Sequence, residues 1–264
     1  MNTHKALLVI SFGTSFGETR EKTITATEND LAKAFPDYVL RRAFASHHII
    51  KKLIERDGLA INSVPQAIER LLAEGYREVI AQPLQVINGI EFHQVWSRLH
   101  ACEAQFSRLA IGCPLLTHEK DYADVIEALR AELPHCARNE AVVLMGHGSQ
   151  HPANASYAQL DYMFKDAGCP QVYIGTMEGY PRLEVIMRRL EADGIRKVNL
   201  LPFMLVAGEH AQNDMAGEEA HSWKMILQRN GYVVSTRLLG LGEIEKIRQI
   251  YVAHARAALE NEIN

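Results

Sequence analysis

The chain has 264 residues, enough for one large domain or two smaller domains that each bury a core. Hydrophobic residues make up 47% of it and charged residues 23%, which is an ordinary balance for a globular protein. The formal net charge of −4 argues against a nucleic-acid binder, which usually carries a basic surplus, but it does not exclude an acidic ligand.

Short apolar runs bounded by Gly, Pro or Ser alternate with longer amphipathic stretches along the chain. These patterns predict strands at 5–11, 38–44, 77–83, 109–113, 141–146, 171–176, 196–202 and 232–237. They predict helices at 18–34, 47–56, 64–74, 91–105, 119–132, 154–167, 181–193, 213–229 and 243–261. Strands that alternate with helices of this length indicate parallel β-α-β units, so we expect an α/β fold.

Two parts of the chain read like copies of one another. Residues 6–15 and 141–149 each contain an apolar strand followed by a glycine-containing loop. Residues 75–91 and 194–210 each contain a glycine, a strand, a proline and a second glycine in the same order. We infer a duplicated α/β unit. The alternative is that any two β-α-β units share such patterns.

The best candidate linker is Pro134 with the polar run at 135–140, near the middle of the chain. We therefore place the first domain at 1–134 and the second at 135–264. The sequence leaves open whether the helix expected at 243–261 packs on the first domain.

Only the second copy carries histidines at the matching positions. His147 aligns with Phe12, and His210 aligns with Glu91. Glu178 follows a third strand of the same copy. Because ligands in open α/β sheets bind beyond the carboxyl ends of strands, we expect these three side chains of the second copy to converge.

Two imidazoles and a carboxylate suit a divalent metal such as Co, Ni, Fe or Zn, and the histidines can also accept protons near neutral pH. His147 lies between two glycines, which offer no packing reason for a histidine. For His210, the alternative to a functional role is that it is an ordinary histidine in a surface loop. For Glu178, the alternative to metal binding is that its charge stabilises the N-terminus of the following helix. We interpret the remaining histidines as solvated or structural, including His47, His48, His93, His118, His151 and His221.

Residues 13–17 match the G-x-S-x-G nucleophile elbow of α/β-hydrolases. Such an enzyme needs strands earlier in the chain to form its oxyanion hole. Here the matching loop follows the first strand that we expect, at 5–11. We therefore interpret the loop as substrate-binding, with the Thr14 and Ser15 hydroxyls and backbone N–H groups available to an anion. Ser11 and Gly13 belong to the same candidate site.

No dinucleotide or Walker A glycine pattern is present, so we expect no nucleotide or organic cofactor. We see no secretory signal and no apolar stretch long enough for a membrane span, and we expect a cytoplasmic protein without nucleic-acid or membrane partners. The sequence leaves open whether the protein forms a homo-oligomer. The cysteines are scattered and suggest incidental thiols: Cys102, Cys113, Cys136 and Cys169.

Three stretches together resemble a known family, at residues 7–15, 145–148 and 202–215, with Ser222-Trp223-Lys224 adding to the match. The family is that of the anaerobic cobalt chelatases of cobalamin biosynthesis, within the class II chelatases. The resemblance implies two similar Rossmann-like or flavodoxin-like domains, each with a four-stranded parallel sheet, that face one another across a cleft.

The resemblance also implies the activity, which is ATP-independent insertion of Co²⁺ into the tetrapyrrole sirohydrochlorin or its reduced form, precorrin-2. The family's metal-binding histidine, glutamate and histidine map onto His147, Glu178 and His210, of which Glu178 is the least distinctive. We add Glu91 as a candidate secondary proton acceptor or metal-path residue. Three alternatives remain: an iron chelatase that forms siroheme, a non-catalytic haem- or metal-binding protein, and a hydrolase using Ser15.

Overall fold

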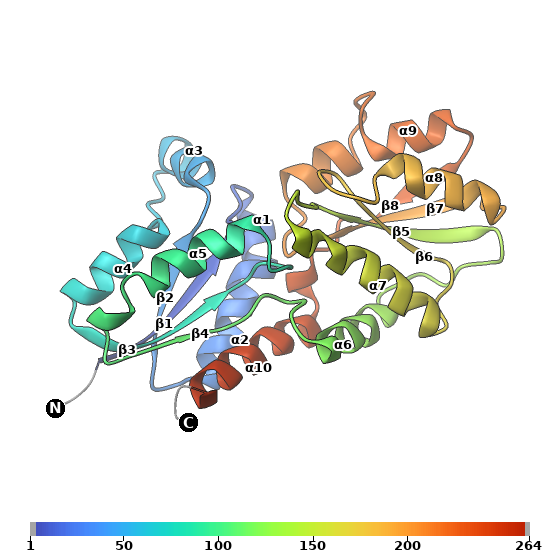
Figure 1. Cartoon of the computed structure of the whole chain (residues 1–264). Coiled ribbons are helices and arrows are strands. Elements are labelled where there is room, and N and C mark those ends of the chain that lie inside the picture. The colour runs from blue at the N-terminus through green and yellow to red at the C-terminus, as the bar shows by residue number, and fades with distance from the viewer. Residues whose placement is uncertain (1–3, 262–264) are drawn as a thin grey trace. The chain divides into compact units, whose positions relative to one another are not determined.

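The computed structural model of the protein describes residues 4–261 (Figure 1). Contacts divide the chain into two compact units. The first consists of Met1–Thr117 with Glu245–Asn264, and the second consists of His118–Ile244. Each unit is an α/β structure with its own sheet and its own hydrophobic core, as the sequence predicted.

The first unit has a parallel four-stranded sheet in the order β2-β1-β3-β4. Its strands are β1 (His4–Ser11), β2 (Val39–Phe44), β3 (Tyr76–Pro83) and β4 (Arg108–Ile111). Its helices are α1 (Gly17–Arg20), the π-helical η1 (Glu21–Thr25), α2 (Ala26–Ala34), α3 (His47–Asp57), α4 (Val64–Ala73), α5 (Ile90–His100), the short η2 (Glu103–Gln105) and α10 (Glu245–Asn261). In Figure 1, α4 and α5 cover one face of the sheet, and α2 and α10 cover the other. Residues of β1 are almost wholly buried because both faces are covered.

The second unit repeats this plan with a parallel sheet in the order β6-β5-β7-β8. Its strands are β5 (Glu140–Gly146), β6 (Val172–Thr176), β7 (Lys197–Phe203) and β8 (Val233–Thr236). Its helices are α6 (Glu119–Arg130), the short η3 (Pro152–Asn154), α7 (Ala155–Asp166), α8 (Leu183–Ala192), the π-helical η4 (His210–Met215), α9 (Trp223–Arg229) and the short η5 (Leu241–Glu243). Helices α8 and α9 contribute to one core cluster with β5 and β7, and α7 packs on β6.

The duplication extends to individual backbone hydrogen bonds at the carboxyl ends of the strands. In the first unit the bonds are Ala45 N–H to Ser11 O and Ser46 N–H to Phe12 O, and in the second they are Met177 N–H to Gly146 O and Glu178 N–H to His147 O. A glycine with positive φ follows in both units, at Gly13 and Gly148. The alignment of Phe12 with His147 therefore holds in three dimensions.

One predicted helix is divided in the structure. Residues 213–229 were expected to form one helix, but η4 ends at Met215 and α9 begins at Trp223. Ser222 explains the break because its hydroxyl accepts a hydrogen bond from Met225 N at 3.2 Å and donates one to Gly217 O at 2.7 Å. A side chain that caps the second helix while bonding to the preceding turn favours two helices over one.

The division into units differs from the expected boundary after residue 134. Helix α6 belongs to the second unit, where it packs on α7 and Arg130 donates to the Ala167 carbonyl. Helix α10 belongs to the first unit, where it lies against α2, β3 and β4. The chain thus enters the second unit before the polar linker and returns to the first unit at its end. Within residues 4–261, no helix combines the length and apolar character that crossing a bilayer requires.

Candidate metal site of the second unit

The structure brings His147, Glu178 and His210 together at the carboxyl edge of the second sheet. They follow β5, β6 and β7, which are neighbours in the sheet. His147 Nε2 lies 3.9 Å from Glu178 Oε1, and the two imidazole rings meet edge to face with their centroids 5.1 Å apart. The side chains are 35%, 58% and 45% exposed in the order His147, Glu178 and His210, so a metal or a substrate can reach them.

The spacing of His147 and Glu178 fits a shared cation. Ligand atoms at roughly 2.1 Å from one ion lie at most about 4.2 Å from each other. The 3.9 Å between Nε2 and Oε1 falls within that limit. A single divalent ion can therefore contact both atoms with little movement of either side chain.

Hydrogen bonds on the far side of each ring determine which nitrogen is available. His147 Nδ1 lies 3.0 Å from the Gly148 carbonyl, and His210 Nδ1 lies 2.7 Å from Asp214 Oδ2. A carbonyl and a carboxylate only accept, so we assign the ring proton of each neutral imidazole to Nδ1. Both Nε2 atoms then carry a lone pair, which is the state that a metal ligand or a proton acceptor needs.

Asp214 is a site residue that sequence reasoning missed. It lies four residues after His210, at the other end of the π-helical turn, and its second oxygen, Oδ1, is 3.5 Å from His221 Nε2. The i, i+4 spacing was visible in the sequence, but only the helical turn places the carboxylate against the ring. A carboxylate that holds the non-ligating nitrogen of a histidine is a common companion of metal sites.

The loops that carry His147 and Glu178 are packed against each other without room for larger residues. Gly148 has a φ of +82°, and a Cβ at this position would lie 2.7 Å from Gly179 N. Asn154 joins the same loops, because its Oδ1 accepts from Ser149 N at 2.9 Å and its Nδ2 donates to Tyr180 O at 2.6 Å. This packing fixes the backbone from which the two side chains project.

The matching positions in the first unit lack a metal-binding set. Phe12 replaces His147 and is 53% exposed, while Ser46 and Glu91 are the counterparts of Glu178 and His210. Ser46 caps α3 by accepting from Ile49 N at 3.3 Å, and Glu91 lies in the first turn of α5. The imidazoles of His147 and His210 therefore have no counterpart at the matching positions of the first unit.

The glycine loop of the first unit keeps its hydroxyls inside. Ser11, Thr14 and Ser15 are at most 4% exposed, and the hydroxyls of Ser11 and Ser15 have no hydrogen-bond partner within the described residues. Thr14 Oγ1 accepts from Phe16 N at 3.2 Å. Their assignment to substrate binding, with Gly13, stays a prediction.

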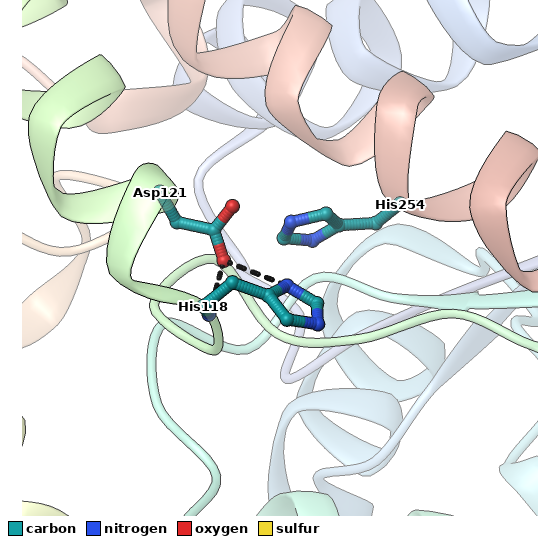
Figure 2. A group of neighbouring side chains, drawn as sticks. All are labelled: His118, Asp121 and His254. Carbon is teal, nitrogen blue, oxygen red and sulfur yellow. Dashed lines mark hydrogen bonds and ion pairs between the residues drawn. The ribbon is translucent and has the colours of Figure 1, made fainter.

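His118 occupies a structural position at the start of α6. Figure 2 shows Asp121 beside it, with Oδ2 accepting from the His118 backbone N–H at 2.6 Å and lying 3.3 Å from His118 Nδ1. This arrangement satisfies one of the free N–H groups at the helix start. His254, also drawn there, belongs to α10 of the first unit, and its Nδ1 lies 3.2 Å from the Cys113 carbonyl.

Comparison with known families gives one match over nearly the whole chain. Residues 5–260 match the family described as cobalt chelatase (CbiK). The sirohydrochlorin cobaltochelatase of Salmonella typhimurium is 44% identical over 255 residues, which cover 97% of this chain and 96% of the relative. The sirohydrochlorin cobaltochelatase CbiKC of Nitratidesulfovibrio vulgaris is 34% identical over 260 residues, covering 97% and 91%.

Solved structures with the same fold are more distant in sequence. SirB from Bacillus subtilis with Fe³⁺ is similar with a TM-score of 0.65 at 16% identity, covering 98% of this chain and 97% of that one. CbiX, described as the terminal enzyme for the biosynthesis of siroheme in denitrifying bacteria, is similar with a TM-score of 0.53 at 17% identity, covering 96% and 99%. At these identities the likeness concerns the fold alone.

Proposed function

Because the chain belongs to the cobalt chelatase (CbiK) family, we propose that it inserts Co²⁺ into sirohydrochlorin in cobalamin biosynthesis. The reaction exchanges two pyrrole N–H protons of the macrocycle for one divalent cation. The protein must therefore deliver a metal, accept protons and hold the ring, and each task needs its own groups.

We assign metal delivery to His147, Glu178 and His210. The observation that carries this assignment is that both imidazoles use Nδ1 for a protein hydrogen bond, whereas neither Nε2 forms a hydrogen bond with any residue of 4–261. The Glu178 carboxylate offsets part of the metal's charge. Three protein ligands that solvent can reach would leave coordination positions open on the ion, so that the ring nitrogens could replace water and then the protein.

The same side chains are suited to accept the pyrrole protons. Once the metal has passed to the ring, the Nε2 atom of a neutral imidazole offers a lone pair that can take a pyrrole proton. Glu91, the first-unit counterpart of His210, remains our candidate for a secondary proton acceptor. We propose that no nucleotide takes part, since the chain has no glycine pattern for one.

We also propose a cytoplasmic location. Within residues 4–261 the four cysteines form no disulfide, as is usual in a reducing compartment.

The decisive experiment combines His147→Ala and His210→Ala with an absorption assay of sirohydrochlorin metallation. Each variant is expected to lose cobalt insertion while its thermal unfolding stays like that of the wild type. His48→Ala, an exposed histidine on α3, is the matched control and is expected to keep full activity. Near-wild-type turnover in either site variant would sink the assignment.

The same assay tests two of the alternatives, the iron chelatase and the non-catalytic binding protein, when Co²⁺, Fe²⁺ and Ni²⁺ are supplied in parallel. We expect cobalt insertion by the wild type. Faster insertion of iron would favour the siroheme branch, since affinity alone does not select cobalt. Binding of the tetrapyrrole without a spectral change over time would indicate a storage or delivery protein.

A further inference from the structure

We propose that a groove between α7 and α8 binds peripheral carboxylates of the tetrapyrrole through Arg182 and Arg188. The inference rests on the proposed function and extends it from the metal to the macrocycle. It concerns the second unit only. The groove, called here the α7–α8 groove, has a volume of about 770 Å³ and is lined by residues 149–158 and 178–188 in part.

The groove adjoins the candidate metal site. Glu178 lies in its wall, and its carboxylate is the one that faces His147 Nε2. A cation held by Glu178 therefore lies beside the groove. If a ring nitrogen takes over that cation, one edge of the ring lies near the groove.

Two guanidinium groups in the groove have no side-chain partner in the described part of the chain. Arg182 is the N-cap residue of α8 and Arg188 lies within the helix, and both are exposed. Within residues 4–261 neither makes an ion pair or a side-chain hydrogen bond, although Glu178 and Glu184 line the same groove. The neighbouring Arg189, by contrast, is paired with Asp161 at 2.8 Å.

These features point to a carboxylate ligand. A guanidinium group presents a planar set of N–H donors that matches a carboxylate in two parallel hydrogen bonds. Sirohydrochlorin carries acetate and propionate groups around its rim, so carboxylates surround the metal-binding centre on all sides. Tyr180, which is 68% exposed in the same wall, adds a hydroxyl donor.

The groove also offers a means of selecting the substrate. A macrocycle rich in carboxylates can engage both arginines, whereas a ring with few carboxylates leaves at least one unpaired. Because unpaired arginines in water cost little, selection comes from the gain with the right ring and not from a penalty with the wrong one.

The test uses Arg182→Gln, Arg188→Gln and the double variant in the full chain. We measure KM for sirohydrochlorin and for Co²⁺ separately, and Kd for metal-free sirohydrochlorin by absorption titration. Each substitution is expected to raise KM and Kd for the tetrapyrrole about tenfold, as expected for loss of one charge-assisted contact, and to leave KM for Co²⁺ unchanged. Adding salt is expected to weaken wild-type binding more than binding by the double variant.

Arg196→Gln is the matched control. Arg196 belongs to the same unit, is exposed and makes no ion pair within residues 4–261. It directly precedes β7 and so lies at the amino ends of the strands, away from the groove. Replacing both groove arginines by lysine is expected to recover part of the affinity, since charge remains but the planar donor set is lost. An unchanged Kd in the folded double glutamine variant would overturn the proposal. The titration contains no metal, so its result stands even if cobalt insertion itself fails.

Discussion

At the two site histidines, the hydrogen bond at Nδ1 determines whether Nε2 is free of a proton and able to bind a metal. Asp214 accepts from His210 Nδ1 at 2.7 Å, and the Gly148 carbonyl lies 3.0 Å from His147 Nδ1. The two supports differ in strength, because a carboxylate is a better acceptor than a carbonyl. We infer that Asp214 is a positioning residue: it holds the ring and its tautomer but does not touch the metal.

Asp214→Ala is expected to reduce kcat/KM for Co²⁺ about 10–100-fold, the usual effect of removing such a support. Asp214→Asn keeps an acceptor oxygen and is expected to lie between the alanine variant and the wild type. The cause can be observed by ¹⁵N NMR of the metal-free protein, where the His210 ring of the alanine variant should show mixed tautomers.

His221→Ala controls for the other contact of Asp214, because His221 Nε2 lies 3.5 Å from its Oδ1. This exposed side chain is expected to be dispensable for cobalt insertion. If Asp214→Ala has wild-type kinetics for Co²⁺, or if it raises KM for sirohydrochlorin alone, the positioning role is refuted.

At the scale of elements, the loops at the strand ends decide where the proposed metal ligands lie. His147 and Glu178 are carried by loops that meet at Gly148 and Gly179, and Asn154 bonds to both loops. The first unit uses the same backbone plan with Phe12 and Ser46 in place of His147 and Glu178. The fold therefore supplies equivalent positions in both units, and the side chains at these positions distinguish the candidate metal site of the second unit.

Gly148→Ala tests how far the site depends on this loop contact. Gly148 and Gly168 both have positive φ, at +82° and +78°, but only the Cβ at Gly148 would meet a neighbour, at 2.7 Å. Gly168→Ala is expected to lower the free energy of unfolding by about 1–2 kcal/mol. Gly148→Ala is expected to cost a further ~1–3 kcal/mol from overpacking and to impair cobalt insertion as well. Urea unfolding measures both, and equal losses in the two variants would argue against tight packing of the loops.

At the scale of the whole chain, the last helix returns to the first unit. Arg248 Nε on α10 lies 2.6 Å from Asp30 Oδ2 on α2, with side chains only 14% and 12% exposed. Tyr251 adds a hydrogen bond from its hydroxyl to the Leu84 carbonyl at 3.1 Å. A helix from the C-terminal end of the sequence therefore covers one face of the sheet at β3 and β4.

This ion pair predicts a pH-dependent part of the stability. Burial alone raises the pKa of Asp30, but the hydrogen bonds and charges of Arg248 and Lys33 outweigh it and lower the pKa overall. A carboxyl with a lowered pKa in the folded state stabilises the fold above its ordinary pKa, near 3.9, and that contribution is lost as the pH falls through the folded-state value.

Arg248→Met is therefore expected to lower the free energy of unfolding by about 1–3 kcal/mol at pH 7. The difference from the wild type should shrink as the pH falls below the ordinary Asp value. Arg256→Met, an exposed position on the same helix, is the control. Denaturant unfolding at several pH values measures the effect, and a difference that stays constant down to pH 3 would show that Asp30 is not the partner that matters.

The sequence by itself determined the local elements and indicated a candidate metal site in the second unit. All eight strands lie within a few residues of their predicted positions, because alternation and apolar runs are local properties that each segment carries alone. The alignment of His147 with Phe12 was likewise available, since a duplicated fold repeats its loops at matched places in the chain.

Only the tertiary structure decided which distant segments meet. It assigned α6 to the second unit and α10 to the first, placed Asp214 against His210, and gathered Arg182 and Arg188 beside Glu178. It also showed the Ser11 and Ser15 hydroxyls to be buried. Periodicity reports which face of an element is apolar, but the partner of that face and the direction of a polar side chain depend on contacts between residues far apart in sequence.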